Sequence, residues 1–147
     1  MSKVVRLEPF APHIYGEQRR AFIRQVIGIV LDLSLDDEYK AKILRDLIWK
    51  YTEADGKHNV RHRSAGATSA EFESQKELKS KLRHDHVFPI DHLLKRLMGC
   101  SPAQRSDVLE EAVSCLVTMD EHLELSRWDK THPGWAKYEK AKVQYDG

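Results

Sequence analysis

Two adjacent segments with helical apolar spacing place the strongest constraint on how this 147-residue chain folds. Residues 17–33 repeat apolar side chains at the three- and four-residue spacing of one helix face, namely Phe22, Val26, Ile29, Val30 and Leu33. Residues 34–54 carry a second stripe of this kind, made of Ile43, Leu44, Leu47, Ile48 and Tyr51. Ser34 stands at the N-cap position of the second stripe, with Asp37 at capping-box distance. The short connection predicts an antiparallel helix pair that supplies much of the core.

The rest of the chain predicts shorter elements. We expect a polar, basic loop over 57–67, a charged helix over 69–82, an extended segment over 83–89 and a short helix over 90–98. Ser101 and Pro102 begin a further helix as N-cap and N1, and it runs to residue 112. The β-prone residues 113–117 predict a buried strand, after which Thr118 and Glu121 form a capping box. A short helix with Trp135 and Tyr138 and a strand over 143–145 complete the chain.

These elements predict a mainly α fold, a single helical domain with a small two-stranded element in its C-terminal half. We expect residues 1–67 to form an N-terminal helical part with the basic loop. Residues 68–147 would form the C-terminal part that carries the two strands. Both parts are expected to belong to one compact domain of ordinary size.

Composition narrows the class of protein. With 41% hydrophobic and 32% charged residues, the chain is not disordered throughout. Its longest apolar run, residues 26–31, is far shorter than the roughly 20 residues that span a bilayer. The N-terminus lacks the apolar core of a signal peptide, and Cys100 and Cys115 do not form a disulfide framework. We therefore expect a cytoplasmic protein with reduced thiols and no membrane contact.

Basic residues gather in one region although the net charge is only +1. Between residues 57 and 86, seven Lys and Arg side chains stand among four histidines and four acidic residues. A locally positive surface suits a phosphate backbone, so we expect nucleic-acid contacts from Arg61, Arg63 and Arg83. The alternative is that these residues form an ordinary solvated surface of mixed charge and bind no nucleic acid. In that case the loop over 57–67 is only a solvated connection. Trp128, Trp135 and Tyr138 are expected in the core or an interface rather than as a base-stacking platform.

Three side chains could carry chemistry. Asp85 and His86 lie on the expected extended segment, and His122 lies early in the helix that follows the second strand. The order strand, strand, helix can bring them together. Carboxylate and imidazole groups are suitable ligands for a divalent ion, and a free histidine with a pKa near 6.5 can accept a proton from water. An ion held there would polarise a phosphodiester.

The run Asp85-His86-Val87-Phe88-Pro89 resembles the first motif of the HNH nucleases, also called His-Me finger or ββα-metal nucleases. The resemblance covers roughly residues 82–125. It implies that Asp85 is a metal ligand, that His86 activates the attacking water and that His122 is a second ligand, with Mg²⁺, Mn²⁺ or Zn²⁺ as the ion. Ser114 is the residue nearest to the family's middle asparagine, and the residues over 90–112 are inserted between the two strands.

Strand geometry leaves the ligand assignment open. Side chains alternate along an extended segment, so His84 and His86 share a face while Asp85 points to the other. His84 is therefore a second candidate ligand, with His86 as the base. A structural zinc site using His84, His86, His122 and Cys115 is disfavoured because it lacks paired cysteines.

The sequence thus predicts a metal-dependent HNH-like endonuclease that hydrolyses phosphodiesters of DNA or RNA, as in conflict between phage and host. The alternative is a degenerate, non-catalytic HNH-like protein that binds nucleic acid or a protein partner as an inhibitor or adaptor. The missing asparagine favours this alternative.

Overall fold

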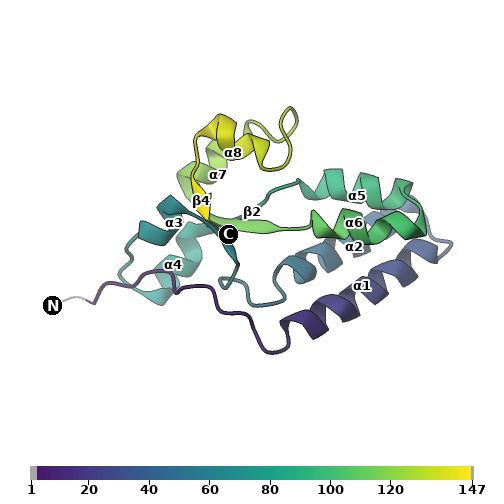
Figure 1. Cartoon of the computed structure of the whole chain (residues 1–147), viewed down its shortest axis with the longest axis horizontal. Helices are drawn as coiled ribbons and strands as arrows, with labels where there is room; N and C mark the ends of the chain where they lie inside the picture. The colour runs from purple at the N-terminus through teal and green to yellow at the C-terminus, as the bar shows by residue number, and fades with distance from the viewer. Residues whose placement is uncertain (1–2, 147) are drawn as a thin grey trace.

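The computed structural model describes residues 3–146 and shows an elongated molecule with a helical end and a sheet end (Figure 1). The helical end contains α1 (Gly16–Asp32), α2 (Asp37–Thr52), α5 (Ile90–Gly99), the 3₁₀ turn η1 (Pro102–Gln104) and α6 (Arg105–Glu110). The sheet end contains β1 (His62–Ser64), β2 (Leu82–His86), β3 (Ser114–Thr118) and β4 (Tyr145–Asp146). Four helices accompany the sheet, α3 (Ala65–Ser69), α4 (Gln75–Lys81), α7 (Met119–Ser126) and α8 (Ala136–Ala141).

The helical end is built on the two long helices expected from the sequence. Apolar residues of α1 and α2 pack with α5 and α6 in one core, in which Leu44 and Ile48 are fully buried. Removing one such side chain from water stabilises the fold by roughly 1.5–3 kcal/mol. The apolar stripe predicted for α1 is only partly correct, because Phe22 and Ile29 face solvent. The buried face of α1 is instead formed by Gly16, Ile23, Ile27 and Val30.

The sheet shows that the predicted fold class is wrong. We expected a mainly α protein with a two-stranded element, but the chain is 54% helix and 12% strand and contains a four-stranded mixed sheet. The strand order is β2-β3-β1-β4, with β1 parallel to β3 and the other pairs antiparallel. The polar residues 62–64 were expected in a loop. They form β1 because β3 and β4 lie beside them, and pairing between distant segments leaves no local pattern.

Capping residues decide where several elements begin. The predicted capping box is confirmed at Thr118–Glu121, which begins α7, and the predicted N-cap Ser101 begins η1, where it also forms a capping box with Gln104. Helix α2 is capped by Asp36, which accepts a hydrogen bond from the Glu38 amide, rather than by Ser34. The helix expected over 69–82 is shorter than predicted and covers only Gln75–Lys81 (α4), whereas α3 lies mostly within the segment expected as a loop.

Both faces of the sheet are covered. Leu82 and Leu116 pack on one face with apolar residues from the N-terminal segment, from α4 and from the connections beside the sheet. On the other face, Cys115 and Val117 pack with Leu125 of α7 and Tyr138 of α8. Within residues 3–146 no helix combines the length and the apolar character needed to cross a membrane.

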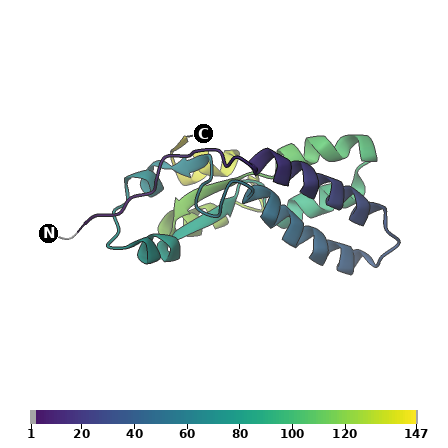
Figure 2. The same ribbon diagram turned by 90° about the horizontal axis from the view of Figure 1, so that it is seen from below.

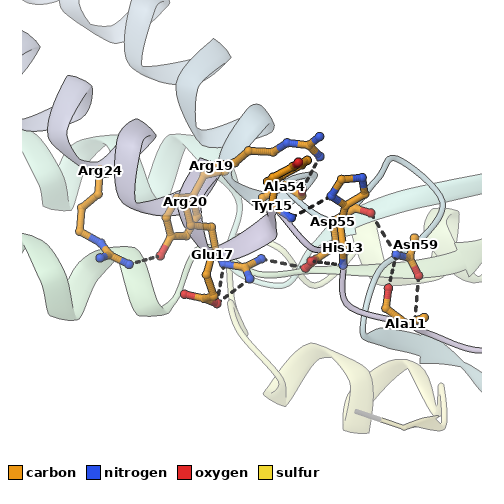
Figure 3. Close-up of polar contacts among 11 residues, drawn as sticks. Ala11, His13, Tyr15, Glu17, Arg19, Arg20, Arg24, Ala54, Asp55 and Asn59 are labelled. Atoms are coloured by element: carbon orange, nitrogen blue, oxygen red, sulfur yellow. Dashed lines mark hydrogen bonds and ion pairs between the residues drawn. The ribbon is translucent and has the colours of Figure 1, made fainter.

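A polar network fixes the segment before α1 to the loop after α2 (Figure 3). The Asp55 carboxylate accepts hydrogen bonds from the His13 amide at 3.0 Å and from a guanidinium nitrogen of Arg20 at 2.8 Å. Nearby, the Asn59 side chain exchanges hydrogen bonds with the backbone of Ala11 at 3.1 and 2.6 Å. These contacts hold the C-terminal end of α2 in place, and α2 contributes side chains to the site described below.

Gly16 permits the close approach of Asp55, since a Cβ at residue 16 would lie 2.1 Å from Asp55 Oδ1. We expect Gly16→Ala to lower the free energy of unfolding by about 1–3 kcal/mol, because the carboxylate must move away from Arg20. Asp55→Ala removes the ion pair with Arg20 and also the carboxylate with which a side chain at residue 16 would collide. The losses in the double variant should therefore be less than additive in urea unfolding. Additive losses would show that the two residues act independently.

Candidate functional site

Strands β2 and β3 and helix α7 form the strand, strand, helix order expected from the sequence. β2 pairs antiparallel with β3 over five residue pairs, with Asp85 opposite Cys115. Helix α7 follows β3 directly at the Thr118 cap. The alternation of side chains along β2 places Asp85 towards α7 and α8, and places His84 and His86 towards α2.

The Asp85 carboxylate is buried, with 3% of its surface exposed. Its two oxygens each lie 3.1 Å from Nζ of Lys137, and the Tyr138 hydroxyl donates a further hydrogen bond to Oδ2. Burial raises the pKa of Asp85 above its ordinary value, and the Lys137 ammonium opposes this rise. Burial beside the carboxylate also raises the pKa of Tyr138, which therefore remains a protonated donor.

The Lys137 ammonium has acceptors on three sides. Besides Asp85, its Nζ donates to the His86 carbonyl and to Asp129 Oδ1, both at 2.8 Å, and the side chain is fully buried. Gly134 helps to bring this lysine beneath β2. Its amide donates to the Val87 carbonyl at 2.9 Å, and its φ of +89° suits a residue without a side chain.

His122 approaches Asp85 from α7. Its Nδ1 lies 3.9 Å from Asp85 Oδ1, too far for a hydrogen bond, and this nitrogen is buried without a partner. The imidazole itself remains about one-third exposed. Two of the three side chains that the sequence analysis expected to converge, Asp85 and His122, are therefore neighbours.

His86 is held on the opposite side of β2 by α2. Its ring packs edge-on against Trp49 at a centroid distance of 4.3 Å, and its Nε2 lies 3.4 Å from Thr52 Oγ1. The Thr52 hydroxyl already donates to the Trp49 carbonyl, so it can only accept from His86. This contact therefore favours the tautomer with hydrogen on Nε2. Burial lowers the pKa of His86 to about 3, which keeps the ring neutral at pH 7.

His84 shares this environment. Its ring lies 6.0 Å from Trp49 and 5.9 Å from His58, and neither of its ring nitrogens has a hydrogen-bond partner. Burial lowers the pKa of His84 to about 4, so this ring is also neutral at pH 7. His84 and His86 thus contact α2 and the loop that follows it, and neither side chain faces Asp85.

The side chains do not fit a resident divalent ion. Within residues 3–146 no group of three His, Cys, Asp or Glu side chains is placed to hold one. Asp85 and His122 provide two ligands at most, because His84 and His86 point to the other side of the strand. The Asp85 oxygens are already bound by Lys137 and Tyr138. The cation that neighbours the Asp85 carboxylate is the Lys137 ammonium.

A cleft with a volume of about 650 Å³ opens beside these residues. His84, Asp85, His86 and His122 all contribute to its lining. Its basic side chains come from four parts of the chain, with Arg45 on α2, Lys57 in the following loop, Lys79 on α4 and Arg83 on β2.

The three predicted phosphate contacts lie in different places. Arg83 lines the cleft. Arg61 lies over the Phe10 ring at 5.5 Å and lines a separate cavity of about 500 Å³. Arg63 is buried, and its guanidinium donates to the carbonyls of Glu8 and Val60, so it supports the N-terminal segment.

Sequence reasoning missed Lys137, Asp129 and Trp49. Lys137 and Tyr138 follow Trp135 in a short helix, where an aromatic pair predicts core packing and a lysine predicts solvent. Nothing local indicates that this lysine reaches an aspartate 52 positions earlier. Trp49 lies within the second predicted helix but outside its apolar stripe, and its contacts with His84 and His86 depend on the tertiary fold.

The neutral histidines make stability depend on pH. In the unfolded chain both have a pKa near 6.5, whereas the folded values are about 4 for His84 and about 3 for His86. Below pH 6.5 the unfolded state therefore binds more protons, and the free energy of unfolding falls as pH falls. Between pH 6 and pH 4, urea unfolding should show a loss of up to about 1.4 kcal/mol per pH unit for each histidine.

The variant His86→Phe keeps an aromatic ring against Trp49 but cannot titrate. It should remove about half of this pH dependence, while His84 accounts for the remainder. A pH profile identical to that of the wild-type protein would contradict a buried, neutral His86.

Comparison of the whole chain with known protein families, with characterised proteins and with solved structures finds no match.

Proposed function

We propose that the protein binds nucleic acid through an HNH-like cleft in which Lys137 supplies the positive charge that a divalent ion would otherwise supply. The observation that carries this proposal is the fully buried ammonium held by Asp85, Asp129 and the His86 carbonyl. By the HNH resemblance, Asp85 is a metal ligand. In this chain a covalently attached cation takes that position. The proposed activity is therefore binding without hydrolysis.

The charges around the cleft support a phosphate ligand. Of its basic side chains, Arg45 forms an ion pair with Asp91, whereas Lys57, Lys79 and Arg83 make no ion pair within residues 3–146. Lys137 offsets one of the two negative charges of lining residues Asp85 and Asp129, so one net negative charge there and Glu53 oppose these three basic side chains. The cleft is thus positive overall, as binding to a phosphate backbone requires.

Aromatic and imidazole groups add a second kind of contact. Trp49 is half-buried in the cleft wall and offers a flat surface for a base. The neutral His84 ring also lines the cleft, but both of its nitrogens are buried, so it adds ring surface rather than a hydrogen-bonding group. Cys100 and Cys115 are both free thiols, which suits a reducing compartment, and we place this activity in the cytoplasm.

Binding can be measured by fluorescence anisotropy with labelled DNA and RNA, single- and double-stranded, over a range of salt concentrations. We expect a dissociation constant that rises steeply with salt, because bound phosphates release counterions. The double variant Lys79→Ala/Arg83→Ala should weaken binding at least tenfold and reduce the slope of log K against log salt by about 1.5. The matched control Lys95→Ala/Lys140→Ala removes equal charge outside the cleft and should bind normally. Equal losses in both variants, or no binding, would refute the proposal.

A metal-dependent HNH-like endonuclease is the second candidate, and the approach of His122 to Asp85 within 3.9 Å favours it. In this candidate Asp85 and His122 hold the ion and His86 is the base. It requires Lys137 to leave Asp85 and requires His86 to be reached by water, although only 8% of its surface is exposed. These two requirements place it behind the binding proposal.

Metal titration separates the two candidates. In calorimetry with Mn²⁺ and with Zn²⁺, the wild-type chain should bind no ion at Asp85, and labelled nucleic acids should remain intact. The variant Lys137→Ala should gain an ion site, because Asp85 and Asp129 lose their shared cation. Circular dichroism checks that this variant folds, since a buried ion pair that loses one partner costs about 3–5 kcal/mol. An ion that binds the wild-type chain and is lost in Asp85→Asn, with cleavage that is lost in His86→Ala, would establish the nuclease instead.

A further inference from the structure

Helices α1 and α2 expose a large apolar surface. On α1, Phe22 and Ile29 are 66% and 61% exposed, and Leu33 directly after it is 46% exposed; on α2, Tyr39 and Ile43 are 67% and 39% exposed. The two helices lie side by side along one face of the helical end, where Figure 2 shows them in front of α5 and α6. Single apolar residues at a surface are ordinary, but a contiguous patch of this kind marks an interaction site.

One exposed residue, Phe22, and two half-buried apolar residues line a hollow between the two helices. Phe22 and Val26 of α1 and Leu47 of α2 line a shallow depression of about 440 Å³ between the helices. At 100° per residue, Phe22, Val26, Ile29 and Leu33 lie roughly a quarter-turn from the buried Ile23, Ile27 and Val30. Each long helix therefore has one apolar face in the core of its own chain and a second apolar face left in solvent.

We propose that this surface binds a second copy of the chain, with the two α1–α2 pairs related by a two-fold axis. The spacing of α2 is symmetric about Ile43. Tyr39 and Leu47 lie four residues to either side of it, and Asp36 and Lys50 lie seven residues to either side. A two-fold axis at Ile43 packs α2 antiparallel to its copy, with Tyr39 against the partner's Leu47. The same axis places Asp36 of each copy beside the partner's Lys50. The interface therefore contains two equivalent contacts between opposite charges.

Helix α1 has the same symmetry. Phe22 pairs with Leu33, and Val26 with Ile29, about a centre between residues 27 and 28. Because α1 and α2 are antiparallel and joined by residues 33–36, that centre lies within about one helical turn of the height of Ile43. A single axis can therefore pass close to both centres. The product is a four-helix arrangement of the kind formed by apolar helix pairs.

The size of the surface predicts the strength of the contact. Seventeen residues make α1 about 25 Å long, and two helices side by side are about 20 Å wide. Such a face buries on the order of 1,000 Å² in total, at the lower limit for a specific interface. We therefore expect a reversible dimer with a dissociation constant in the micromolar range.

Sedimentation velocity of the full chain from about 1 to 300 μM tests the proposal. The wild-type chain should change from monomer to dimer within this range. Lys50→Asp and Asp36→Lys each create two like-charge contacts and should weaken dimerisation about tenfold. The double variant Asp36→Lys/Lys50→Asp restores opposite charges and should dimerise within threefold of the wild-type chain. Lys95→Glu, a charge reversal at an exposed residue of α5 outside the α1–α2 surface, is the matched control and should dimerise normally.

Asp36 also caps α2, so thermal unfolding by circular dichroism accompanies each variant. Rescue in the double variant, in which the cap is still missing, separates charge pairing from helix stability. A chain that stays monomeric at 300 μM would overturn the proposal. So would single charge reversals that dimerise as the wild-type chain does, or a double variant that remains as weak as the singles.

Discussion

The buried Lys137 ammonium is the interaction on which the arrangement around β2 depends. Removing a charge from water costs several kcal/mol, and that cost is offset only when the hydrogen-bonding capacity of the group is used. Here three N–H donors meet the carboxylates of Asp85 and Asp129 and the His86 carbonyl. These acceptors come from β2 and from the loop before α8, so the ammonium fixes the position of that loop against the strand. Burial beside this cation also explains how Asp85 can lie 3% exposed in an apolar layer.

The same ammonium bears on what the cleft can do. A divalent ion keeps open coordination positions through which it polarises a phosphate and activates water. An ammonium whose three donors are already used offers a charge but no vacant position. It offsets one of the two carboxylate charges that would repel a phosphate, so the unpaired basic side chains Lys57, Lys79 and Arg83 outnumber the acidic charge that remains at the cleft. This difference between charge and coordination is why we place binding ahead of hydrolysis.

Those parts of the fold and of the site that depend on local periodicity can be predicted from the sequence. The two-residue alternation of β2 correctly separated Asp85 from His84 and His86, and the capping box at Thr118 correctly marked the start of the helix that carries His122. Contacts between distant segments left no such pattern. The polar residues of β1 become a strand only because β3 lies beside them, and Lys137 lies in a helix whose sequence predicts exposure. Arg63 illustrates the same limit, because its acceptors Glu8 and Val60 are carbonyls that no sequence pattern reveals.

The position of His86 connects the helical end to the sheet end. A histidine that activates water needs an accessible ring, yet α2 covers this one with Trp49 and Thr52. Helix α2 is in turn held against the core by Leu44 and Ile48, and its C-terminal end by the Asp55 network. Exposing His86 would therefore require α2 to move and would disrupt the helical core. The face that α2 turns away from His86 bears Ile43 and Tyr39. Dimerisation through that face would restrain α2 further, so the proposed dimer and a buried, neutral His86 stabilise one another.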